Sequence, residues 1–192
     1  MQFEDEIYFS KNFQWKSVDV NDGIDLANKY NDRIRTLYMD QANLLLSKDE
    51  FYNSFTAGII LFAVIDCLGT FLTTKKRFKN KLDEFLKESE EFNKLNEPDG
   101  IIISKMITKC FRNGIIHNGR VKESCQFDYN FDNKLFVLHE DILIINTKHL
   151  FELVSVVLNS YIDRVITNEV EMSIFKKTFA IEFESEIKRL TV

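Results

Sequence analysis

Residues Phe51 to Leu72, FYNSFTAGIILFAVIDCLGTFL, decide the fold of this chain. Apolar residues lie on nearly every side of a helix built from this segment, and such a helix must be enclosed by other elements. Its continuous apolar run, Ala57 to Ile65, has nine residues, whereas a membrane span needs about 18 to 20. The segment therefore predicts the buried central helix of a soluble bundle, with no membrane association.

The composition favours long helices in a globular chain. Among 192 residues there are 18 Phe but only 1 Pro and 6 Gly, the two residue types that most often interrupt helices and strands. Hydrophobic residues make up 45% and charged residues 29%, which argues against a disordered, fibrous or low-complexity protein. At this length we expect one domain over residues 1–192, because such a chain can bury a sizeable core.

Charge and cysteine content restrict the class of protein further. The net charge of −5 and the pI of about 5.3 argue against a globally basic nucleic-acid-binding domain, so any site for a polyanion must be local. The three Cys are an odd number without a Cys-x-x-Cys pair, so neither a disulfide framework nor a zinc site is expected. The acidic N-terminus does not resemble a signal peptide. These features predict a reduced, cytoplasmic protein.

Helical signals precede the central segment. Residues 1–20 show no clear period and are expected to form an N-terminal arm. Asn21 and Asp22 are good caps for a helix that runs to about Ser47. Ser47 and Glu50 match a capping box, which predicts the start of the central helix. The residues expected on the buried face of the first helix are Ile24, Ala27, Tyr30, Ile34, Leu37, Leu44 and Leu45.

A third helix is predicted for about Lys75 to Leu95. Basic residues crowd its N-terminal end and acidic residues its C-terminal end, an order that opposes the helix dipole. A linker or a solvated face explains the basic residues, and a basic rim for an anionic ligand is the alternative. The loop from Asn96 to Gly100, with the only Pro of the chain, then predicts a new helix from Ile101 to about Ile116.

After Lys122 the period changes from 3.6 to 2, which is typical of strands. The alternation and its turns predict a small antiparallel hairpin or meander over about 126–146. A helix is expected from about Thr147, and a last, Phe-rich helix from about Glu169 to Leu190. The predicted fold class is therefore mainly α, an up-and-down bundle of four to six helices with a small sheet inserted after the fourth helical segment.

The chain lacks the sequence patterns of the common metal and nucleotide sites. Its three His, His117, His139 and His149, have no metal-ligand spacing to each other or to carboxylates. The six Gly are scattered, so there is no phosphate-binding loop, and no Gly-x-Ser-x-Gly elbow occurs. We expect neither a metal nor a cofactor. His139 and His149 are explained most simply as a turn residue and a residue at the start of a helix.

The segment from Phe111 to Arg120, FRNGIIHNGR, carries the clearest chemical signal. From Ile101 to Lys122 there are five basic residues and no acidic one, in a chain that is acidic overall. Arginine binds phosphate with two hydrogen bonds, and a histidine with a pKa near 6.5 transfers protons near neutral pH. Together they supply what RNA cleavage by the 2′-hydroxyl requires, namely proton transfer and charge stabilisation without a metal.

Arg112 and Asn113, followed by His117, resemble the R-x4-6-H motif of the HEPN superfamily, in which a polar residue commonly follows the Arg. The resemblance implies an all-helical domain, frequently a metal-independent ribonuclease. The order of segments is also similar: a long apolar helix bearing an acid, Asp66 in AVIDCLG, then a variable helix, the motif helix and a closing helix. The resemblance covers about residues 22–165, and the strands resemble an insertion of some bacterial members.

The resemblance implies an endoribonuclease that acts on single-stranded or looped RNA, a toxin or defence effector restrained by an antitoxin or another regulatory protein. Arg112 is expected to clamp a phosphate, His117 to act as general acid or base, and Asn113 to orient or donate hydrogen bonds. Asp66 is expected either to pair with Arg112 or to tune His117. The residues expected to follow the RNA backbone, or else to form a solvated helix face, are Lys105, Lys109, Arg120 and Lys122.

Helix geometry adds a constraint on this site. Residues five apart on a straight helix point about 140° apart, so one helix cannot aim both Arg112 and His117 at one phosphate. Either Gly114 distorts the helix or two chains share the site. In HEPN proteins two motif helices typically meet across a two-fold axis, which implies a homodimer. Two alternatives stay open: a non-catalytic HEPN-like module that binds RNA, a nucleotide or a protein, and a helical interaction module whose motif is coincidental.

Overall fold

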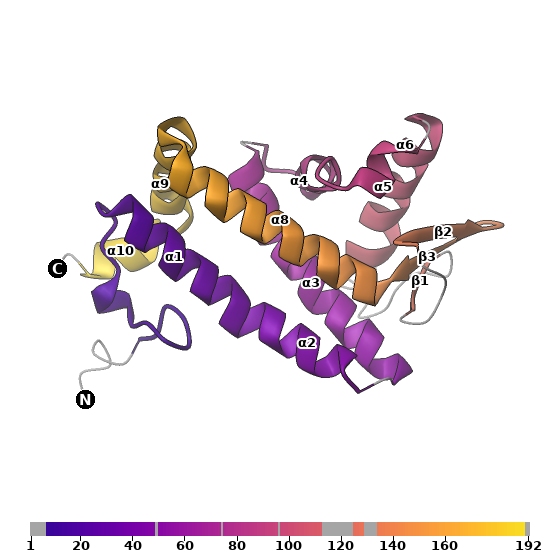
Figure 1. Cartoon of the computed structure of the whole chain (residues 1–192), viewed down its shortest axis with the longest axis horizontal. Coiled ribbons are helices and arrows are strands. Elements are labelled where there is room, and N and C mark those ends of the chain that lie inside the picture. Colours follow the sequence, from indigo (N-terminus) through magenta and orange to yellow (C-terminus); the bar gives the residue numbers. More distant parts are fainter. Residues whose placement is uncertain are drawn as a thin grey trace. The chain divides into compact units, whose positions relative to one another are not determined.

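The computed structural model describes residues 7–48, 50–73, 75–95, 97–112, 125–128 and 134–190. The fold is mainly helical with one small sheet, which confirms the predicted fold class at that level (Figure 1). Its α-helices are α1 (Gly23–Ile34), α2 (Asp40–Leu46), α3 (Phe51–Leu72), α4 (Phe78–Leu86), α5 (Glu90–Asn93), α6 (Glu97–Met106), α8 (Thr147–Thr167), α9 (Glu169–Glu182) and α10 (Glu184–Leu190). The other elements are the 3-10 turn η2 (Trp15–Ser17), the π-helical segments η3 (Arg35–Met39) and η4 (Ile107–Arg112), and the strands β1 (Cys125–Asp128), β2 (Phe136–His139) and β3 (Ile142–Asn146).

The chain divides into two compact units. Unit 1 consists of Met1–Asp40 and Leu158–Val192, and unit 2 of Gln41–Val157. The candidate motif and the sheet belong to unit 2. The N-terminal residues, α1, η3, α9 and α10 belong to unit 1, so the predicted arm and the Phe-rich C-terminal segment are parts of the same unit.

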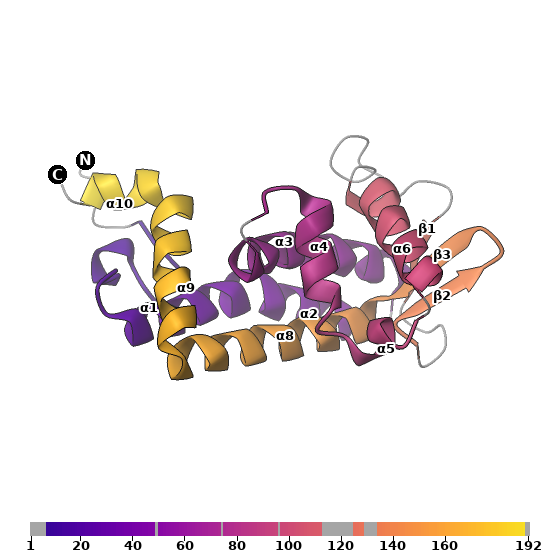
Figure 2. The ribbon, with the colours of Figure 1, turned by 90° about the horizontal axis from the view of Figure 1, so that it is seen from above.

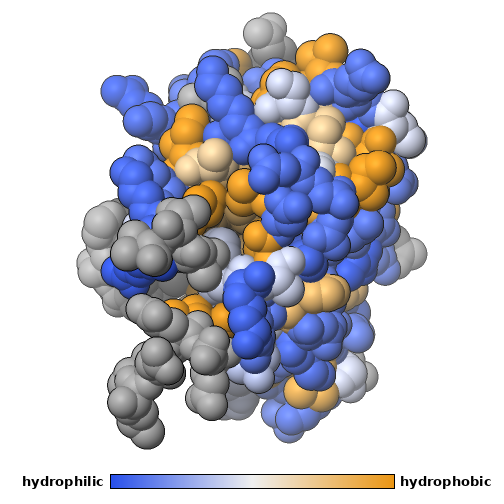
Figure 3. Space-filling view, turned by 90° about the vertical axis from the view of Figure 1, so that its left-hand side faces the viewer, coloured by the Kyte–Doolittle hydropathy of each residue, from blue (hydrophilic) through white to orange (hydrophobic). Residues whose placement is uncertain are grey.

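Aromatic side chains form the core of unit 1. Phe175 and Phe179 of α9 are fully buried, so the Phe-rich segment packs inside. Phe9, from the predicted N-terminal arm, is also fully buried and lies 4.7 Å from Trp15 and 5.9 Å from Phe179 between ring centroids. The opposite side of α9 carries the exposed apolar residues Val170, Ile174 and Ile181. On the face seen in Figure 3, exposed apolar side chains occur in small groups between hydrophilic ones.

The last helix is interrupted, where the sequence predicted one helix from about Glu169 to Leu190. Asn168 caps α9 as its side chain accepts hydrogen bonds from the backbone N–H groups of Val170 (2.9 Å) and Glu171 (3.2 Å). At Phe183 the backbone leaves helical geometry, with φ −112° and ψ 25°, and α10 begins at the next residue. The rings of Phe179 and Phe183, four residues apart, still contact each other with their centroids at 4.5 Å.

The first predicted helix forms, but its buried face shifts by one residue along the way. The carboxylate of Asp22 accepts a hydrogen bond from the N–H of Asp25 (3.0 Å), as expected of a cap. The π-helical segment η3 then adds one residue to a turn, so the buried positions advance by five, from Ile34 to Met39. The buried apolar residues are Leu26, Ala27, Tyr30, Ile34, Met39, Ala42 and Leu46, whereas Ile24, Leu37 and Leu44 are exposed, contrary to the prediction.

The predicted capping box before α3 is wrong. The hydroxyl of Ser47 donates to the carbonyl of Leu44 (2.8 Å) and so belongs to the end of α2. Glu50 occupies the cap position of α3, and its side chain makes no capping hydrogen bond. The start of α3 therefore depends on packing of its apolar residues rather than on a local cap.

Helix α3 is the central element of unit 2, as predicted. Its fully buried residues lie on one half of the helix, whereas Tyr52, Thr56 and Ala63 on the opposite side are exposed; α4 lies across it (Figure 2). The segment Tyr52–Leu72 is long and apolar enough to cross a membrane by length and composition, and half of it is buried inside the protein. Gly58 allows β1 to approach α3 closely, because a Cβ at this position would lie 2.5 Å from the ring of Phe127 in β1.

The third predicted helix is two helices, α4 and α5. Ser89 interrupts it, and the Ser89 hydroxyl caps α5 by accepting a hydrogen bond from the N–H of Phe92 (3.2 Å). Glu90 and Glu91 thus lie in the first turn of a new helix, where the dipole favours them. The charge order that seemed unfavourable on one long helix is therefore largely explained by this break.

The sheet has the strand order β1-β3-β2. β2 and β3 form the predicted antiparallel hairpin, in which His139 pairs with Ile142 and the connecting Glu140 has φ 54°. A three-stranded meander is wrong, because β1 pairs with β3 in parallel, with Phe127 opposite Ile145. β3 is the most continuously apolar strand, so the central position, flanked on both edges, suits it best.

Glu91 joins α5 to the start of β2, and its removal is expected to destabilise unit 2. Both carboxylate oxygens accept a hydrogen bond from the N–H of Leu135 at 2.9 Å, and Leu135 is buried. Glu91→Ala leaves that N–H unpaired, so we expect the free energy of unfolding to fall by about 1–3 kcal/mol in urea titrations. Glu90→Ala is the matched control, because Glu90 lies in the same helical turn with its side chain 92% exposed. Equal losses in both variants would contradict this role of Glu91.

Candidate functional site

The helix that leads into the motif begins earlier than predicted. α6 starts at Glu97, so most of the predicted loop is helical. Pro98 lies in the first turn, where a missing N–H costs no helical hydrogen bond, and this explains why the proline does not exclude a helix. The helix continues as η4 (Ile107–Arg112), the last segment described before the residues that follow the motif arginine. π-helical segments are frequent at functional sites.

Helix α6 and η4 bury one apolar side in unit 2 and make a polar contact with α4. Ile103, Ile107 and Cys110 are buried. Ser104, which is 2% exposed, donates its hydroxyl hydrogen bond to the carboxylate of Asp83 in α4. The same carboxylate pairs with Lys79 at 2.7 Å. The motif helix is thus fixed to α4 by a carboxylate that is itself paired with a cation.

The solvent side of this helix carries two lysines beside the exposed Ile101 and Ile102. Lys105 and Lys109 are both exposed, and four residues apart they lie on one side of the helix. Within the described part of the chain neither of them has a carboxylate partner, in contrast to Lys79, Lys81 and Lys87, which all do. No acid in the described part of the chain therefore neutralises their charge. These two lysines form a local basic surface of the kind that the sequence predicts in this acidic chain.

The remaining motif residues are described only in part. The backbone of Arg112 forms the last residue of η4. Asn113, His117, Arg120 and Lys122 lie outside the described residues. Among the described residues, no three His, Cys, Asp or Glu side chains are grouped so that they could hold a metal ion.

Asp66 pairs with a residue that the sequence did not suggest. Its carboxylate oxygen lies 2.9 Å from the Nζ of Lys81 in α4, and the side chain of Lys81 is only 15% exposed. Lys81 also lies very close to Gly69, which is one turn further along α3. A Cβ at Gly69 would lie 2.4 Å from the Cβ of Lys81. Asp66 therefore pairs with Lys81, Gly69 leaves room for it, and together they attach α4 to α3. The spacing of an acid and a glycine in AVIDCLG is explained by this contact.

Loss of the Asp66 carboxylate is expected to destabilise unit 2 moderately. Asp66→Ala leaves the mostly buried ammonium of Lys81 unpaired, so we expect a loss of about 1–2 kcal/mol in urea titrations. Glu84→Ala breaks the more exposed pair with Lys87 (2.9 Å) and is expected to cost less than about 0.5 kcal/mol. Lys81→Met added to Asp66→Ala should recover part of the loss. A double variant no more stable than Asp66→Ala would show that the unpaired ammonium is not the cause.

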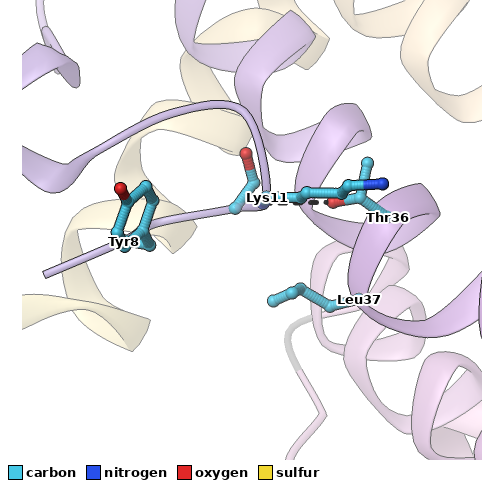
Figure 4. A pocket seen from close by; sticks show the side chains of 5 residues that line it. Tyr8, Lys11, Thr36 and Leu37 are labelled. Atoms are coloured by element: carbon cyan, nitrogen blue, oxygen red, sulfur yellow. Dashed lines mark hydrogen bonds between the residues drawn. The ribbon is translucent and has the colours of Figure 1, made fainter.

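A shallow pocket of about 400 Å³ occurs in unit 1. Figure 4 shows the Tyr8 ring on one side of it and Leu37 and Thr36 on the other, with the Lys11 backbone N–H donating to the Thr36 hydroxyl at 3.3 Å. Tyr8 and Leu37 are exposed. The residues that line it do not include a candidate acid, base or nucleophile from the motif, so we do not assign the chemistry to this pocket.

The chain matches no model of a known protein family, no curated protein and no solved structure. The resemblance to HEPN proteins therefore depends on the motif residues and on the order of the segments alone.

Proposed function

We propose that this protein is a metal-independent endoribonuclease of the HEPN type, whose site is completed by a homodimer. The observation that supports this best is the pair of exposed lysines on α6 and η4, Lys105 and Lys109, which have no carboxylate partner among the described residues, with Arg112 following in η4. An uncompensated basic surface in an acidic chain fits a polyanion. The helical fold, with a long central helix before the motif helix, is compatible with such a domain.

The proposed reaction uses the RNA's own 2′-hydroxyl. His117 accepts the proton of that hydroxyl, and the 2′-oxygen forms a bond to the adjacent phosphorus. The bond from phosphorus to the 5′-oxygen breaks, and that oxygen receives a proton from the His117 of the second chain. The products are a 2′,3′-cyclic phosphate and a 5′-hydroxyl. Arg112 binds the non-bridging oxygens, whose charge grows in the transition state, and Asn113 orients them by hydrogen bonds.

In this proposal three lysines and one arginine between residues 101 and 122 bind the RNA substrate. Lys105, Lys109, Arg120 and Lys122 contact phosphates next to the cleaved one, without reading sequence. Proton transfer and charge stabilisation need neither a metal nor a cofactor. Uncontrolled RNA cleavage harms a cell, so we place the protein in the cytoplasm as a toxin or defence effector that an antitoxin or a regulatory protein restrains.

The test compares RNA with a substrate that lacks the nucleophile. Wild-type protein is incubated in EDTA with a pool of single-stranded RNA oligonucleotides and with the same sequences containing 2′-deoxy sugars. We expect cleavage of RNA only, with 2′,3′-cyclic phosphate ends detected by mass spectrometry, by protein that sediments as a dimer. Cleavage of the deoxy pool, loss of activity in EDTA, or folded dimeric protein without activity would each overturn the proposal. RNA binding without cleavage would instead indicate the non-catalytic binding module.

A further inference from the structure

A second basic segment lies at the start of α4. Between Asp66 and Asp83 the chain has no acidic residue and five basic ones, namely Lys75, Lys76, Arg77, Lys79 and Lys81. The two flanking carboxylates are already paired. Asp66 lies 2.9 Å from Lys81, and Asp83 lies 2.7 Å from Lys79. The other three cations, residues 75–77, precede α4, are exposed and have no carboxylate partner among the described residues.

The fold of unit 2 does not require the side chains of residues 75–77. They lie in solvent, whereas the next residue, Phe78, is buried and begins α4. Arg77 occupies the cap position of α4, but its side chain makes no capping hydrogen bond. Three adjacent cations repel one another, and the dipole of a helix disfavours positive charge at its start. The break at Ser89 explains the acidic residues of this region but not these cations, which oppose folding.

The segment 75–77 lies toward the same side of unit 2 as the end of the motif helix. α4 packs beside α6, where Asp83 accepts the hydrogen bond of Ser104. Figure 2 shows α4 and α6 running in roughly opposite directions, so the start of α4 and the end of η4 lie toward the same side. Lys105 directly follows Ser104, and Lys109 lies one turn nearer to that end. The two sets of exposed cations therefore belong to one side of unit 2.

We propose that Lys75, Lys76 and Arg77 form a second phosphate-binding site, which binds the backbone of single-stranded RNA. The choice of RNA as the polyanion rests on the proposed function. Ammonium and guanidinium groups bind phosphate oxygens without reading sequence, and each contact releases counterions from the nucleic acid. A bound polyanion converts the repulsion among the three cations into attraction. A flexible single strand can follow cations that come from two different elements.

The surroundings of this segment favour a nucleic acid over a membrane or a protein partner. Among the described residues between Tyr52 and Ile101, no large apolar side chain is exposed. Peripheral membrane binding by a basic surface is weak unless apolar side chains insert beside it, and protein interfaces depend on buried aromatic and aliphatic anchors. Charge alone is therefore what residues 75–77 offer, and charge is the part of RNA binding that needs no apolar contact.

The test measures binding without cleavage. Wild-type protein and the triple variant Lys75→Gln, Lys76→Gln, Arg77→Gln are titrated into a fluorescent oligonucleotide of mixed sequence whose 2′-O-methyl sugars lack the nucleophile. We expect the affinity of the triple variant to be about a hundredfold lower at about 0.1 M salt. The plot of log affinity against log salt should become shallower by about 2, because each phosphate contact with a single strand contributes about 0.7 to that slope.

A control variant carries the same change of net charge at other positions. Lys87, Lys94 and Lys188 are exposed lysines, at 64%, 77% and 71% of their side chains, and each pairs with a carboxylate. Changing all three to Gln should weaken binding less than about threefold, because charges far from the bound strand are screened by salt. Equal losses in the two triple variants, or binding of anionic phospholipid vesicles but not of the oligonucleotide by the wild type, would overturn the inference.

Two further measurements separate this site from a structural role and from the proposed catalysis. The 75–77 variant should unfold in urea at the same concentration as the wild type or a higher one, and a lower midpoint would show that these side chains serve the fold. If oligonucleotide binding depends on residues 75–77 but the wild type cleaves no RNA, the proposed function fails while the binding site stands. If the wild type cleaves RNA and the variant binds as tightly as it does, the binding site fails and the proposed function stands.

Discussion

Replacing His117 with alanine is expected to lower the rate constant of RNA cleavage by about 10²- to 10⁴-fold, the usual contribution of a positioned acid or base. The loss should appear in single-turnover measurements with saturating protein, because RNA binding depends mainly on the basic residues. Arg112→Ala should lose about 10²- to 10³-fold by removing charge stabilisation. Arg112→Lys should remain well below wild type, because a lysine keeps the charge but not the two parallel hydrogen bonds.

His139 provides the matched control for this prediction. It lies exposed at the end of β2, pairs with Ile142 in the hairpin and is not part of the motif. His139→Ala should cleave RNA at the wild-type rate. If His117→Ala also cleaves at that rate while remaining dimeric, the motif is not the catalytic site. If His139→Ala is as inactive as His117→Ala, the loss does not report on the motif.

Gly69→Ala is expected to destabilise unit 2 by a steric clash between α3 and α4. The added Cβ would lie 2.4 Å from the Cβ of Lys81 and 3.1 Å from its Cα and carbonyl oxygen. Backbone atoms cannot rotate away, so α4 must move off α3, and the pair between Lys81 and Asp66 moves with it. Overpacking costs about 1–3 kcal/mol, and here we expect a net loss of about 2 kcal/mol despite the better helix propensity of alanine.

Gly100→Ala separates the clash from the intrinsic effect of alanine. Gly100 also lies in a helix, α6, but its nearest neighbour would be the Phe92 ring at 3.5 Å, an ordinary contact. We expect this variant to be more stable than wild type by up to about 1 kcal/mol in urea titrations. A Gly69→Ala protein as stable as Gly100→Ala would show that α3 and α4 do not approach as closely as described.

Local sequence signals were sufficient wherever a residue acts on its own neighbours. Asp22 caps α1 as predicted, and Thr147 begins the long helix α8 after the strands. The same local reasoning failed at two other helix ends. Ser47 does not cap α3, because local pattern cannot tell the end of one helix from the start of the next. The break at Phe183, with its contact to Phe179, is of the same kind.

The candidate site was likewise predicted from the sequence only in part. The sequence indicated a basic, acid-free segment, and the structure exposes Lys105 and Lys109 on the described part of it. The catalytic roles of Arg112 and His117 stay predictions. The partner of Asp66 could not be predicted, because Lys81 reaches it through the packing of α4 on α3.

The apolar segment from Phe51 to Leu72 determined by itself that this protein contains a long helix that packs against other elements, since so much apolar surface can be removed from water only by covering it. Periodicity and composition then determined that mostly helices do so. Only the tertiary structure decided the phase of each helix after a π-helical segment, the parallel pairing of β1 with β3, and the contact of Lys81 with Asp66 and Gly69. These depend on contacts between residues distant in sequence, whose energies no local pattern contains.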